Sequence, residues 1–475
     1  HLLTDLPSGL TKIDEIPFDF ERRRLTVVVA NDAHQWMITK GAFEEMLAVC
    51  DRVQLNGDVL PLTPERIRKL KQTNAAMSGQ GMRMIVVAYR QDVHQQEIYT
   101  PADEQHMVLA GFLGFLDPAK PDGKEAIGLL GAHGVRVKVL TGDNAIITQH
   151  VAEEVGIANQ LVATGNDVDA MDDSALRQAV ETTDLFVKLS PMQKARIIKT
   201  MRAAGHTVGY MGDGINDTAA LREADVSISV DTAADITKDA SGIILLEKSL
   251  LVLEDGILEG RRVYANAMKY IKMTIASNFG NAFSVLVASI FLPFLPMLAI
   301  QLLVQNLIYD TSQMTIPWDN VDEATLAQPT PWRAKGLLRY TLTFGPLSSI
   351  FDITTFLFLW FGLGVGTHAA SVSAQHLFQA GWFVVGLFTQ SLVVHVLRTR
   401  HTPFWRSPAS AIVILSTMMA LLVGLFIILS PFHQAFDFGI LPVTYWPGAA
   451  VIILVYLILV ETVKRIYLKR GRPWL

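Results

Sequence analysis

Apolar and polar residues follow two different patterns along this chain, and the change comes near Tyr270. Before this point, short apolar stretches alternate with amphipathic segments, as in a soluble α/β protein. After it, apolar runs of about 20 residues follow one another, which is the length that crosses the apolar core of a bilayer. Six such runs are predicted as membrane-spanning helices, at 272–293, 296–315, 341–364, 379–398, 408–430 and 442–466.

Basic residues mark one side of these predicted spans. They follow the second, fourth and sixth runs, as Arg333, Lys335, Arg339, Arg398, Arg400, Arg406, Lys464, Arg465, Lys469, Arg470 and Arg472. The opposite connections, at 366–376 and 431–439, contain no Lys or Arg. By the positive-inside rule, the soluble region, the basic loops and the C-terminus are expected to be cytoplasmic. Buried core helices of a soluble protein would not need this asymmetry, so we interpret the chain as a multi-pass membrane protein.

Strands and helices alternate between about Gly114 and Glu247. Apolar β-type stretches at 135–140, 206–212, 225–230 and 242–247 are predicted strands. Residues 144–156 and 190–205 have helical spacing, and the second of these helices has Ser190 as its expected N-cap and Pro191 at its first position. This order predicts a parallel sheet with helices on both faces, whose functional sites lie at the carboxyl ends of the strands.

Residues able to handle phosphate gather at those strand ends. Thr141, Asp143, Asp213 and Asp217 each follow a predicted strand, and Lys194 lies in the first turn of a helix, where an anion is favoured. Carboxylates as close as those of the loop at 212–217 repel each other unless a cation lies between them. A hydroxyl, a lysine and a carboxylate-bound Mg²⁺ together indicate phosphoryl transfer. Any one of these could be an ordinary turn residue, but chance does not explain the whole set in order.

Composition excludes several other classes of protein. The net charge of −5 and the pI near 6.2 give no reason to expect a nucleic-acid partner. The single cysteine, Cys50, excludes an internal disulfide framework and is expected to be a buried thiol. The histidines are scattered without an HExxH motif, so a zinc site is not predicted.

Four motifs in order resemble the phosphorylation domain of P-type ATPases, a haloacid-dehalogenase-like fold: DPAKP (117–121), TGDN (141–144), SPMQK (190–194) and GDGINDTAAL (212–221). Upstream, the segments at 17–29, 39–47 and 81–90 resemble the nucleotide-binding domain of that family. The resemblance covers nearly the whole chain. It implies α/β cytoplasmic domains, nucleotide-binding over residues 1–110 and phosphorylation over 111–258, followed by a six-helix membrane domain over 259–475.

The resemblance also implies roles for individual residues, with ATP and Mg²⁺ as cofactors. Phe18 would stack on adenine, Arg23 and Lys40 would line the nucleotide pocket, and Arg83 would reach the phosphates. The phosphoryl-transfer set would be Thr141, Gly142, Asp143, Lys194, Asp213, Asn216 and Asp217, with the catalytic Mg²⁺ on Asp213 and Asp217. A Phe on a strand usually belongs to a core, and a Lys-Gly pair is usually part of a turn. The residues assigned to the nucleotide therefore support a nucleotide site only when they are taken together.

One departure from the family pattern concerns the phosphorylated residue. The family forms its phosphoenzyme on the Asp of a DKTGT motif, and these 475 residues contain none. The chain is therefore interpreted as the C-terminal half of a pump, without the segment that carries this Asp, the actuator domain and the first four membrane helices. We expect it to bind nucleotide and Mg²⁺ but to be inactive as an ATPase alone.

Polar residues in the first two predicted spans indicate a transport site. Asn278 and Asn281 are three residues apart and share one helix face, and Asn306 and Asp310, four apart, share another. Polar groups at this depth are costly and by default mark an ion pathway, although asparagines can also join helices by hydrogen bonds. Asp310 does not fit that alternative, because a carboxylate there needs a cation or a proton.

The transported ion is expected to be Mg²⁺. Where calcium-transporting members carry a carboxylate, Asn281 supplies an amide, and Mg²⁺ is commonly held by one or two carboxylates while it keeps several waters. The segment 276–322 resembles the bacterial magnesium-transporting subfamily, which imports Mg²⁺. The alternative ion is H⁺, carried by a lone buried Asp. Of the later polar residues, Glu461 is expected to pair with Lys464 or Arg465, while Gln390 has no assigned role and Asp352 remains open.

Two further interpretations concern other classes of protein. A non-catalytic nucleotide-binding membrane protein remains an alternative, and a phosphatase fused to an unrelated channel does not, because it too would need the nucleophilic Asp. The expected partners are the transported cation, the other half of the pump and membrane lipids, possibly anionic ones at the basic loops. The expected location is the bacterial inner membrane.

Overall fold

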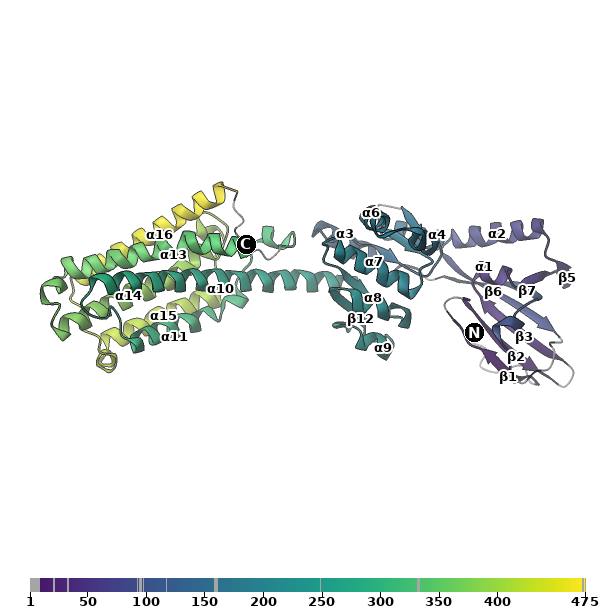
Figure 1. Ribbon diagram of the computed structural model, residues 1–475, viewed down its shortest axis with the longest axis horizontal. Helices are drawn as coiled ribbons and strands as arrows, with labels where there is room; N and C mark the ends of the chain where they lie inside the picture. Colours follow the sequence, from purple (N-terminus) through teal and green to yellow (C-terminus); the bar gives the residue numbers. More distant parts are fainter. Residues whose placement is uncertain are drawn as a thin grey trace. The chain divides into compact units, whose positions relative to one another are not determined.

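The structure is a computed structural model that describes residues 9–19, 22–31, 34–91, 93, 96, 98–116, 118–157, 161–247, 249–330, 334–471 and 474. Asp117 of the DPAKP motif and two of the basic residues, Arg333 and Arg472, lie outside the described residues. The chain forms two compact units, His1–Glu254 and Asp255–Leu475 (Figure 1). The boundary lies close to the change in hydrophobic pattern.

The first unit begins with a seven-stranded mixed sheet in the order β1-β2-β3-β6-β7-β4-β5. Its strands are β1 Thr11–Ile16, β2 Arg24–Ala30, β3 Gln35–Gly41, β4 Cys50–Leu55, β5 Asp58–Pro61, β6 Met82–Gln91 and β7 Met107–Leu116. Neighbours are antiparallel except for β4 and β7, which are parallel. Side chains alternate between buried and less buried along β6 because one face of the sheet covers a core.

Two helices, α1 Phe43–Leu47 and α2 Pro64–Ser78, contact β6 and close this core. Phe43 and Met46 of α1 are buried against Met37, Val86 and other apolar side chains of the sheet. The Thr63 hydroxyl caps α2 by accepting a hydrogen bond from the amide of Arg66, and Pro64 begins the helix. The predicted buried thiol is confirmed, because Cys50 is buried and free, and burial raises the pKa of its thiol to about 12.

The rest of the first unit is an α/β layer with two small parallel sheets, β8-β10-β9 and β11-β12-β13. The strands are β8 Val139–Leu140, β9 Val162–Thr164, β10 Leu185–Val187, β11 Gly209–Met211, β12 Val226–Val230 and β13 Ile243–Leu245. The helices are α3 Gly123–Ala132, α4 Ala145–Glu154, α5 Gly165–Ala170, α6 Asp173–Thr182, α7 Pro191–Ala203, α8 Thr218–Glu223 and α9 Asp235–Asp239. The parallel pairing agrees with the sequence, but the described residues form two sheets rather than the single sheet that was expected.

One predicted strand is much shorter than expected. Of residues 135–140, only Val139 and Leu140 pair with β10. Before them, the charged side chains of Arg136 and Lys138 bind Asp184, at 2.6 and 2.9 Å. The two predicted helices are confirmed as α4 and α7, with the Asn144 and Ser190 side chains as caps.

The second unit is helical. Its long helices are α10 Leu250–Phe291, which begins in the first unit, α11 Ala299–Gln313, α13 Ala334–Leu357, α14 Val372–Leu397, α15 Ala411–Leu429 and α16 Tyr445–Lys469 (Figure 1). A short helix, α12 Glu323–Leu326, precedes α13, and a π-helical turn at Phe358–Gly362 extends α13. The most buried is α14, with 78% of its apolar window inside the protein against 22% for α16. It is therefore the central helix of this unit.

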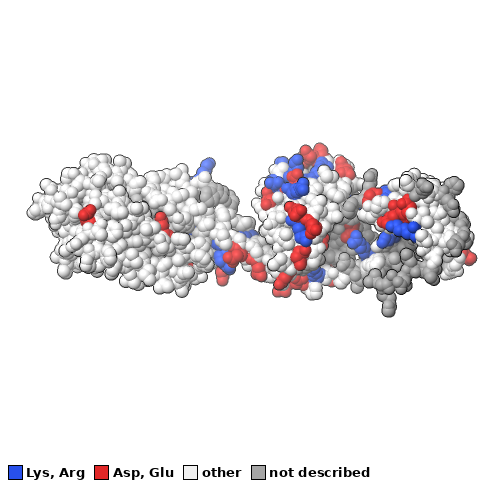
Figure 2. Space-filling model, turned by 90° about the horizontal axis from the view of Figure 1, so that it is seen from below, with Lys and Arg blue, Asp and Glu red and all other residues white. Residues whose placement is uncertain are grey.

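Five helices among the described residues are long and apolar enough to cross a membrane, and they match five of the six predicted spans. The remaining span, 296–315, corresponds to α11, which has 15 residues and is not among the five. Pro293 and Pro296 precede it, and proline cannot continue a helix interior, so α11 begins only at Ala299. On the face seen in Figure 2, Lys, Arg, Asp and Glu cover much of the first unit and almost none of the helical unit. The chain is a membrane protein.

Candidate functional site

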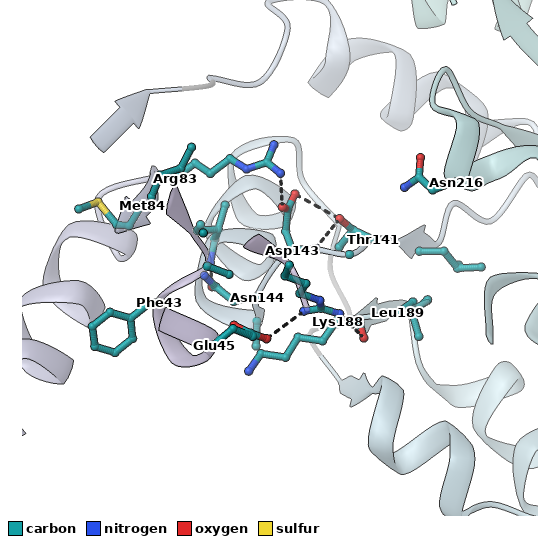
Figure 3. A pocket seen from close by; sticks show the side chains of 18 of the residues that line it. Phe43, Glu45, Arg83, Met84, Thr141, Asp143, Asn144, Lys188, Leu189 and Asn216 are labelled. Carbon is teal, nitrogen blue, oxygen red and sulfur yellow. Dashed lines mark hydrogen bonds and ion pairs between the residues drawn. The ribbon is translucent and has the colours of Figure 1, made fainter. Parts of the chain in front are cut away.

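A cavity of about 1290 Å³ lies in the first unit between the seven-stranded sheet and the α/β layer. Both parts contribute to its lining, so residues more than a hundred positions apart meet there (Figure 3). All the residues predicted for nucleotide binding and phosphoryl transfer line this one cavity: Phe18, Arg23, Lys40, Arg83, Thr141, Gly142, Asp143, Lys194, Asp213, Asn216 and Asp217. The lining holds five Lys or Arg and five Asp or Glu side chains, so it can meet both an anion and a cation.

The Thr141–Asp143 turn directly follows β8 and faces the cavity. The Thr141 hydroxyl accepts a hydrogen bond from the Asp143 amide at 3.1 Å and donates to the Asp143 carboxylate at 3.2 Å. The Asp143 carboxylate also forms an ion pair with Arg83, with Nη2 3.3 Å from Oδ1. Figure 3 shows Asp143 between Thr141 and Arg83, with Asn216 beyond Thr141. The turn is therefore held by its own bonds and tied to the seven-stranded sheet by Arg83.

Asp217 and Lys194 form a buried pair at the floor of the cavity. The Lys194 ammonium lies 2.8 Å from Asp217 Oδ1, and its side chain is 5% exposed. The Tyr210 hydroxyl donates to the same oxygen at 2.7 Å, and the Gly214 amide donates to Oδ2 at 3.3 Å. Burial, with the nearby Asp217 charge, raises the pKa of Tyr210, so Tyr210 acts here as a donor. The oxygens of Asp217 are thus occupied by three protein donors.

Glycine is required where the loop folds back on Asp217. A Cβ on Gly212 would lie 2.5 Å from the Asp217 Cβ, and one on Gly214 would lie 2.2 Å from the Asn216 side-chain oxygen. Both distances are below any contact that real side chains make. The motif GDGIND therefore needs both glycines to bring Asp213 and Asn216 to the cavity.

Asp213 differs from Asp217, because its side chain is exposed at the cavity and has no hydrogen bond or ion pair with a described residue. A free carboxylate next to the Asn216 amide fits Mg²⁺, which proteins usually hold by one or two carboxylates together with phosphate oxygens and water. The described residues contain no group of three or more Asp, Glu, His or Cys that would enclose a metal by themselves. Of the two carboxylates predicted to bind Mg²⁺, Asp213 is the one with free oxygens. The prediction for Asp217 remains untested.

The seven-stranded sheet supplies the other wall. The Phe18 ring is 49% exposed, and Lys40 is exposed without an ion pair to a described residue. Arg23 has a positive φ of 50° and donates to the Lys188 carbonyl at 3.2 Å. The Nη1 atom of Arg23 also lies 3.9 Å from Oε1 of Glu45. An exposed ring and a free ammonium suit a flat base and a phosphate, as the resemblance implies.

Sequence reasoning missed Lys188 and Glu44 in this cavity. The Lys188 ammonium lies 2.9 Å from the Glu44 carboxylate of α1, so the pair joins the two walls. Lys188 directly follows β10, a strand that was not predicted, and the apolar residues at 185–187 were the signal that would have extended the strand-end argument to it. Glu44 carried no comparable signal, because it lies on a short helix of the other wall.

The residues predicted for transport lie on α10 and α11. Asn306 and Asp310 share an exposed face of α11, and Asn278 is exposed on α10. Asn281 is half-buried, and its side-chain oxygen accepts a hydrogen bond from Gln390 Nε2 at 2.8 Å. Among the described residues, no hydrogen bond or ion pair joins the α10 asparagines to Asn306 or Asp310. The structure therefore does not bring the four together through direct contacts.

The buried face of α11 was not anticipated. It carries Gln301, Gln305, Tyr309 and Gln313, spaced by four residues, and Gln301 Nε2 donates to the Phe436 carbonyl at 2.8 Å. The regular spacing of glutamines in an apolar segment was a signal that could have been used.

Two buried or half-buried carboxylates near the ends of the helices, Glu461 and Asp319, form ion pairs. The expected pairing of Glu461 is confirmed, because it lies 3.4 Å from Lys464 and 3.9 Å from Arg465. A buried cluster that the sequence did not reveal joins Asp319 to Lys269 at 2.9 Å and to Arg398 at 2.6 Å. This cluster ties the connections after α11 and α14 to α10.

Comparison with known proteins gives two family matches. Residues 3–122 match the model for the cytoplasmic domain N of P-type ATPases, and residues 294–466 match the model for the C-terminus of cation transporting ATPases. The chain is 47% identical over 466 residues to a "Magnesium-transporting ATPase, P-type 1" of Escherichia coli, covering 98% of this chain and 51% of that protein.

Other relatives show the same extent. A protein of the same name from Salmonella typhimurium is 47% identical over 97% of this chain and 51% of its own length. A calcium-transporting ATPase from Listeria monocytogenes is 31% identical over 62% of this chain and 34% of its own length. The chain spans about half the length of the magnesium-transporting relatives that it matches.

Proposed function

Because this chain belongs to the P-type ATPase family, we propose that it is the C-terminal half of an ATP-driven pump that imports Mg²⁺. In this proposal the other half supplies the phosphorylated Asp, the actuator domain and the first four membrane helices. The pump would be a cation-translocating ATP hydrolase, and this half alone would bind nucleotide without turning it over.

The observation that carries the proposal is the convergence of all eleven predicted cytoplasmic residues on one cavity. They come from the strands and connections of the seven-stranded sheet on one side, and from the loops after β8 and β11 and the first turn of α7 on the other. A cavity of about 1290 Å³ has room for a nucleoside triphosphate and accompanying water. A set of unrelated turn residues would have no reason to meet at one place.

In the proposed site, each wall has its own task. Phe18 stacks on the base, Lys40 and Arg23 bind the nucleotide, and Arg83 exchanges its ion pair with Asp143 for the phosphates. Thr141 and Gly142 orient the transferred group, and Lys194 holds it, kept in place by Asp217. Mg²⁺ held by Asp213, with Asn216 beside it, would neutralise charge on the phosphate oxygens. Positioning and charge stabilisation are what phosphoryl transfer requires of a protein.

The proposed transport site uses the exposed polar faces of α10 and α11, with Asp310 as its carboxylate and Asn278, Asn281 and Asn306 as amides. The names of the most similar relatives support Mg²⁺ over Ca²⁺. A pump for protons or another cation is the alternative, and so is a non-catalytic nucleotide-binding protein.

The proposed membrane arrangement has six crossings, with α11 as a short second crossing paired with α10. The first unit and the C-terminus would be cytoplasmic in the bacterial inner membrane, in line with the basic connections. Anionic lipid headgroups would contact those basic residues.

The test is ATP-driven uptake of Mg²⁺ by the full-length pump in liposomes, with an Asp310→Asn variant. We expect the variant to lose most uptake, because the amide removes the only carboxylate of the proposed site. Asp437→Asn is the matched control, since Asp437 lies at the end of an exposed 3₁₀ turn outside the site and asparagine also tolerates its positive φ. Unimpaired Mg²⁺ uptake by Asp310→Asn would remove the site assignment, and uptake of another ion by the wild type would remove Mg²⁺.

A further inference from the structure

Asp352 of α13 lies inside the second unit and takes no part in the transport site proposed above. It is 7% exposed and lies within an apolar helix. Its Oδ2 shares a hydrogen bond of 2.6 Å with the Ser284 hydroxyl of α10, and its Oδ1 accepts one from the Trp382 indole of α14 at 2.9 Å. The carboxyl group therefore joins three helices through neutral partners.

No cation compensates this carboxyl group among the described residues. Ser284 faces it from α10 and Trp382 from α14, while Tyr456 of α16 is the one titratable group among the described residues that interacts with it. No Lys, Arg or His side chain of the described residues pairs with it. An ionised carboxylate in an apolar interior without a counter-charge is strongly disfavoured, so the group needs a proton.

The hydrogen bonds around Ser284 favour the same state. The Ser284 hydroxyl has one hydrogen, yet its oxygen lies within bonding distance of both Asp352 Oδ2 and the Gly280 carbonyl, at 2.6 and 2.9 Å. If Asp352 carries a proton, its O–H donates to Ser284 and the Ser284 O–H donates to Gly280. Both contacts are then satisfied at once, which an ionised Asp352 cannot achieve.

Asp352, Ser284 and the Gly280 carbonyl form a chain of hydrogen bonds, called the relay here. Close packing of α10 and α13 holds this relay in place. A Cβ on Gly280 would lie 2.1 Å from the Ser348 hydroxyl and 2.9 Å from the Gly345 carbonyl, so the two helices approach closely. The Trp382 indole is fixed by a T-shaped contact with Phe356, with ring centroids 4.9 Å apart. The relay is thus a built feature of the helix packing.

The relay also lies next to the proposed transport face. Ser284 follows Asn281 by three residues, so the two are neighbours on α10. Gln390, which bonds Asn281, follows Trp382 by eight residues, so both lie along one side of α14. Two polar contacts between α10 and α14 therefore lie in succession, Asn281–Gln390 and Ser284–Asp352–Trp382.

We propose that Asp352 is a proton-binding site of the membrane unit, separate from the cation site at Asp310, and that it exchanges its proton during the pump cycle. A proton from a water-borne hydronium bonds to Oδ2 and points to Ser284. On release it returns to a water molecule, and the Ser284 hydroxyl then turns its hydrogen from Gly280 to the carboxylate. Movement of α10 relative to α13 and α14 would open the site to that water.

Infrared difference spectroscopy of the full-length pump in lipid nanodiscs tests this. The wild type should show the C=O stretch of a protonated carboxylic acid that shifts on H/D exchange, and Asp352→Asn should lose it. The stretch should also lose intensity between the nucleotide-free pump and the pump arrested with Mg²⁺ and beryllium fluoride. Absence of the stretch in the wild type, its persistence in Asp352→Asn, or equal intensity in both states would each overturn the proposal.

A second pair of variants keeps the test decisive if Asp352→Asn does not fold. Ser284→Ala should shift the frequency of the stretch, because the acid loses its acceptor. Ser349→Ala is the matched control, since this buried serine also donates to the Gly280 carbonyl, at 3.0 Å, and has no hydrogen bond to Asp352. An unshifted stretch in Ser284→Ala would contradict the relay. The measurement does not depend on which ion is pumped, so it can succeed even if the Mg²⁺ assignment fails.

Discussion

At the scale of single residues, the two aspartates of one loop have different surroundings. Asp217 accepts hydrogen bonds from Lys194, Tyr210 and Gly214, whereas Asp213 is exposed at the same cavity and has no partner in the part of the chain that the structure describes. A carboxylate whose oxygens are occupied orients its neighbours, and one whose oxygens are free can bind a cation. These surroundings suit the two aspartates, four positions apart, to the different roles proposed for them.

This difference predicts the effect of Asp213→Asn in the full-length pump. Phosphoenzyme formation from labelled ATP should fall by roughly 100-fold or more, because a metal contributes several kcal/mol of charge stabilisation to the transferred phosphoryl group. Nucleotide binding should persist, since the residues of the other wall are unchanged. Asp235→Asn is the control, because Asp235 is 96% exposed and pairs only with Lys238 at the surface. Normal phosphoenzyme levels in Asp213→Asn would contradict the role.

A second prediction at this scale concerns Glu104, whose side chain is fully buried in the first unit. It accepts hydrogen bonds from Arg22, Arg24 and Thr26, at 2.5 to 2.7 Å. Burial alone would raise the pKa of Glu104, but these donors outweigh it and the pKa is lowered below 4.5. A lowered folded-state pKa stabilises the fold above the unfolded pKa, and this stabilisation is lost as the pH falls through the folded value.

Glu104→Gln should therefore lower the free energy of unfolding at neutral pH by about 3–5 kcal/mol, because two arginines lose their buried partner. The difference from wild type should shrink below about pH 4.5, where the unfolded chain holds the proton. This difference in stability is measured by hydrogen–deuterium exchange of β2 and β3, compared between variant and wild type at each pH. Glu65→Gln, which breaks an exposed pair with Lys69, should change exchange little. An equal effect at every pH would show that charge is not the cause.

At the scale of elements, α10 is the helix that both units share. It runs without interruption from Leu250 in the first unit to Phe291 in the second, and it carries Asn278 and Asn281. The cluster of Asp319, Lys269 and Arg398 ties its middle to two connections of the helical unit. A continuous helix is suited to pass movement from the nucleotide site to the transport site.

Ala267→Pro tests this role of α10. Proline in a helix interior costs about 3 kcal/mol and clashes with the carbonyl four residues earlier, here Val263, so the helix should kink. Ala267 is exposed, so the change disturbs the backbone rather than the packing. ATP hydrolysis by the full-length pump should continue while ion uptake per ATP falls, measured together in liposomes. Ala267→Ser is the control, and an unchanged ratio of uptake to hydrolysis in Ala267→Pro would count against coupling through α10.

Local sequence signals predicted elements well where the signal and the structure depend on the same neighbours. Ser190 and Pro191 mark the beginning of α7 because caps act within one turn. The strand at 135–140 was predicted too long, because the pairing of Arg136 and Lys138 with Asp184 depends on a residue far along the chain. The span at 296–315 was likewise longer than α11, which begins only after Pro293 and Pro296.

At the scale of the whole molecule, the two units differ in surface charge, so the surface of the first suits water and that of the second suits a bilayer. The first unit carries mixed charge around one large cavity, and the helical unit shows almost no charge on the face in Figure 2. The length of the apolar runs and the uneven distribution of Lys and Arg between them are properties of the sequence. The sequence therefore already predicted which part of the chain lies in a membrane. The boundary between the compact units lies at Glu254, and the domain bounds expected from the resemblance stay a prediction.

The sequence by itself predicted five long apolar helices, the cap of α7 and the family, because each depends on residue types at short spacing. The phosphoryl-transfer chemistry that it indicated at the strand ends stays a prediction. Only the tertiary structure decided which carboxylates have partners. It showed that Asp217 is paired and that Asp213 has no partner among the described residues, that Lys188 joins the cavity walls, and that Asp310 lies on an exposed helix face while Asp352 is buried among neutral partners. The reason is physical: the state of a charged group depends on what surrounds it in space, and those neighbours come from distant parts of the chain.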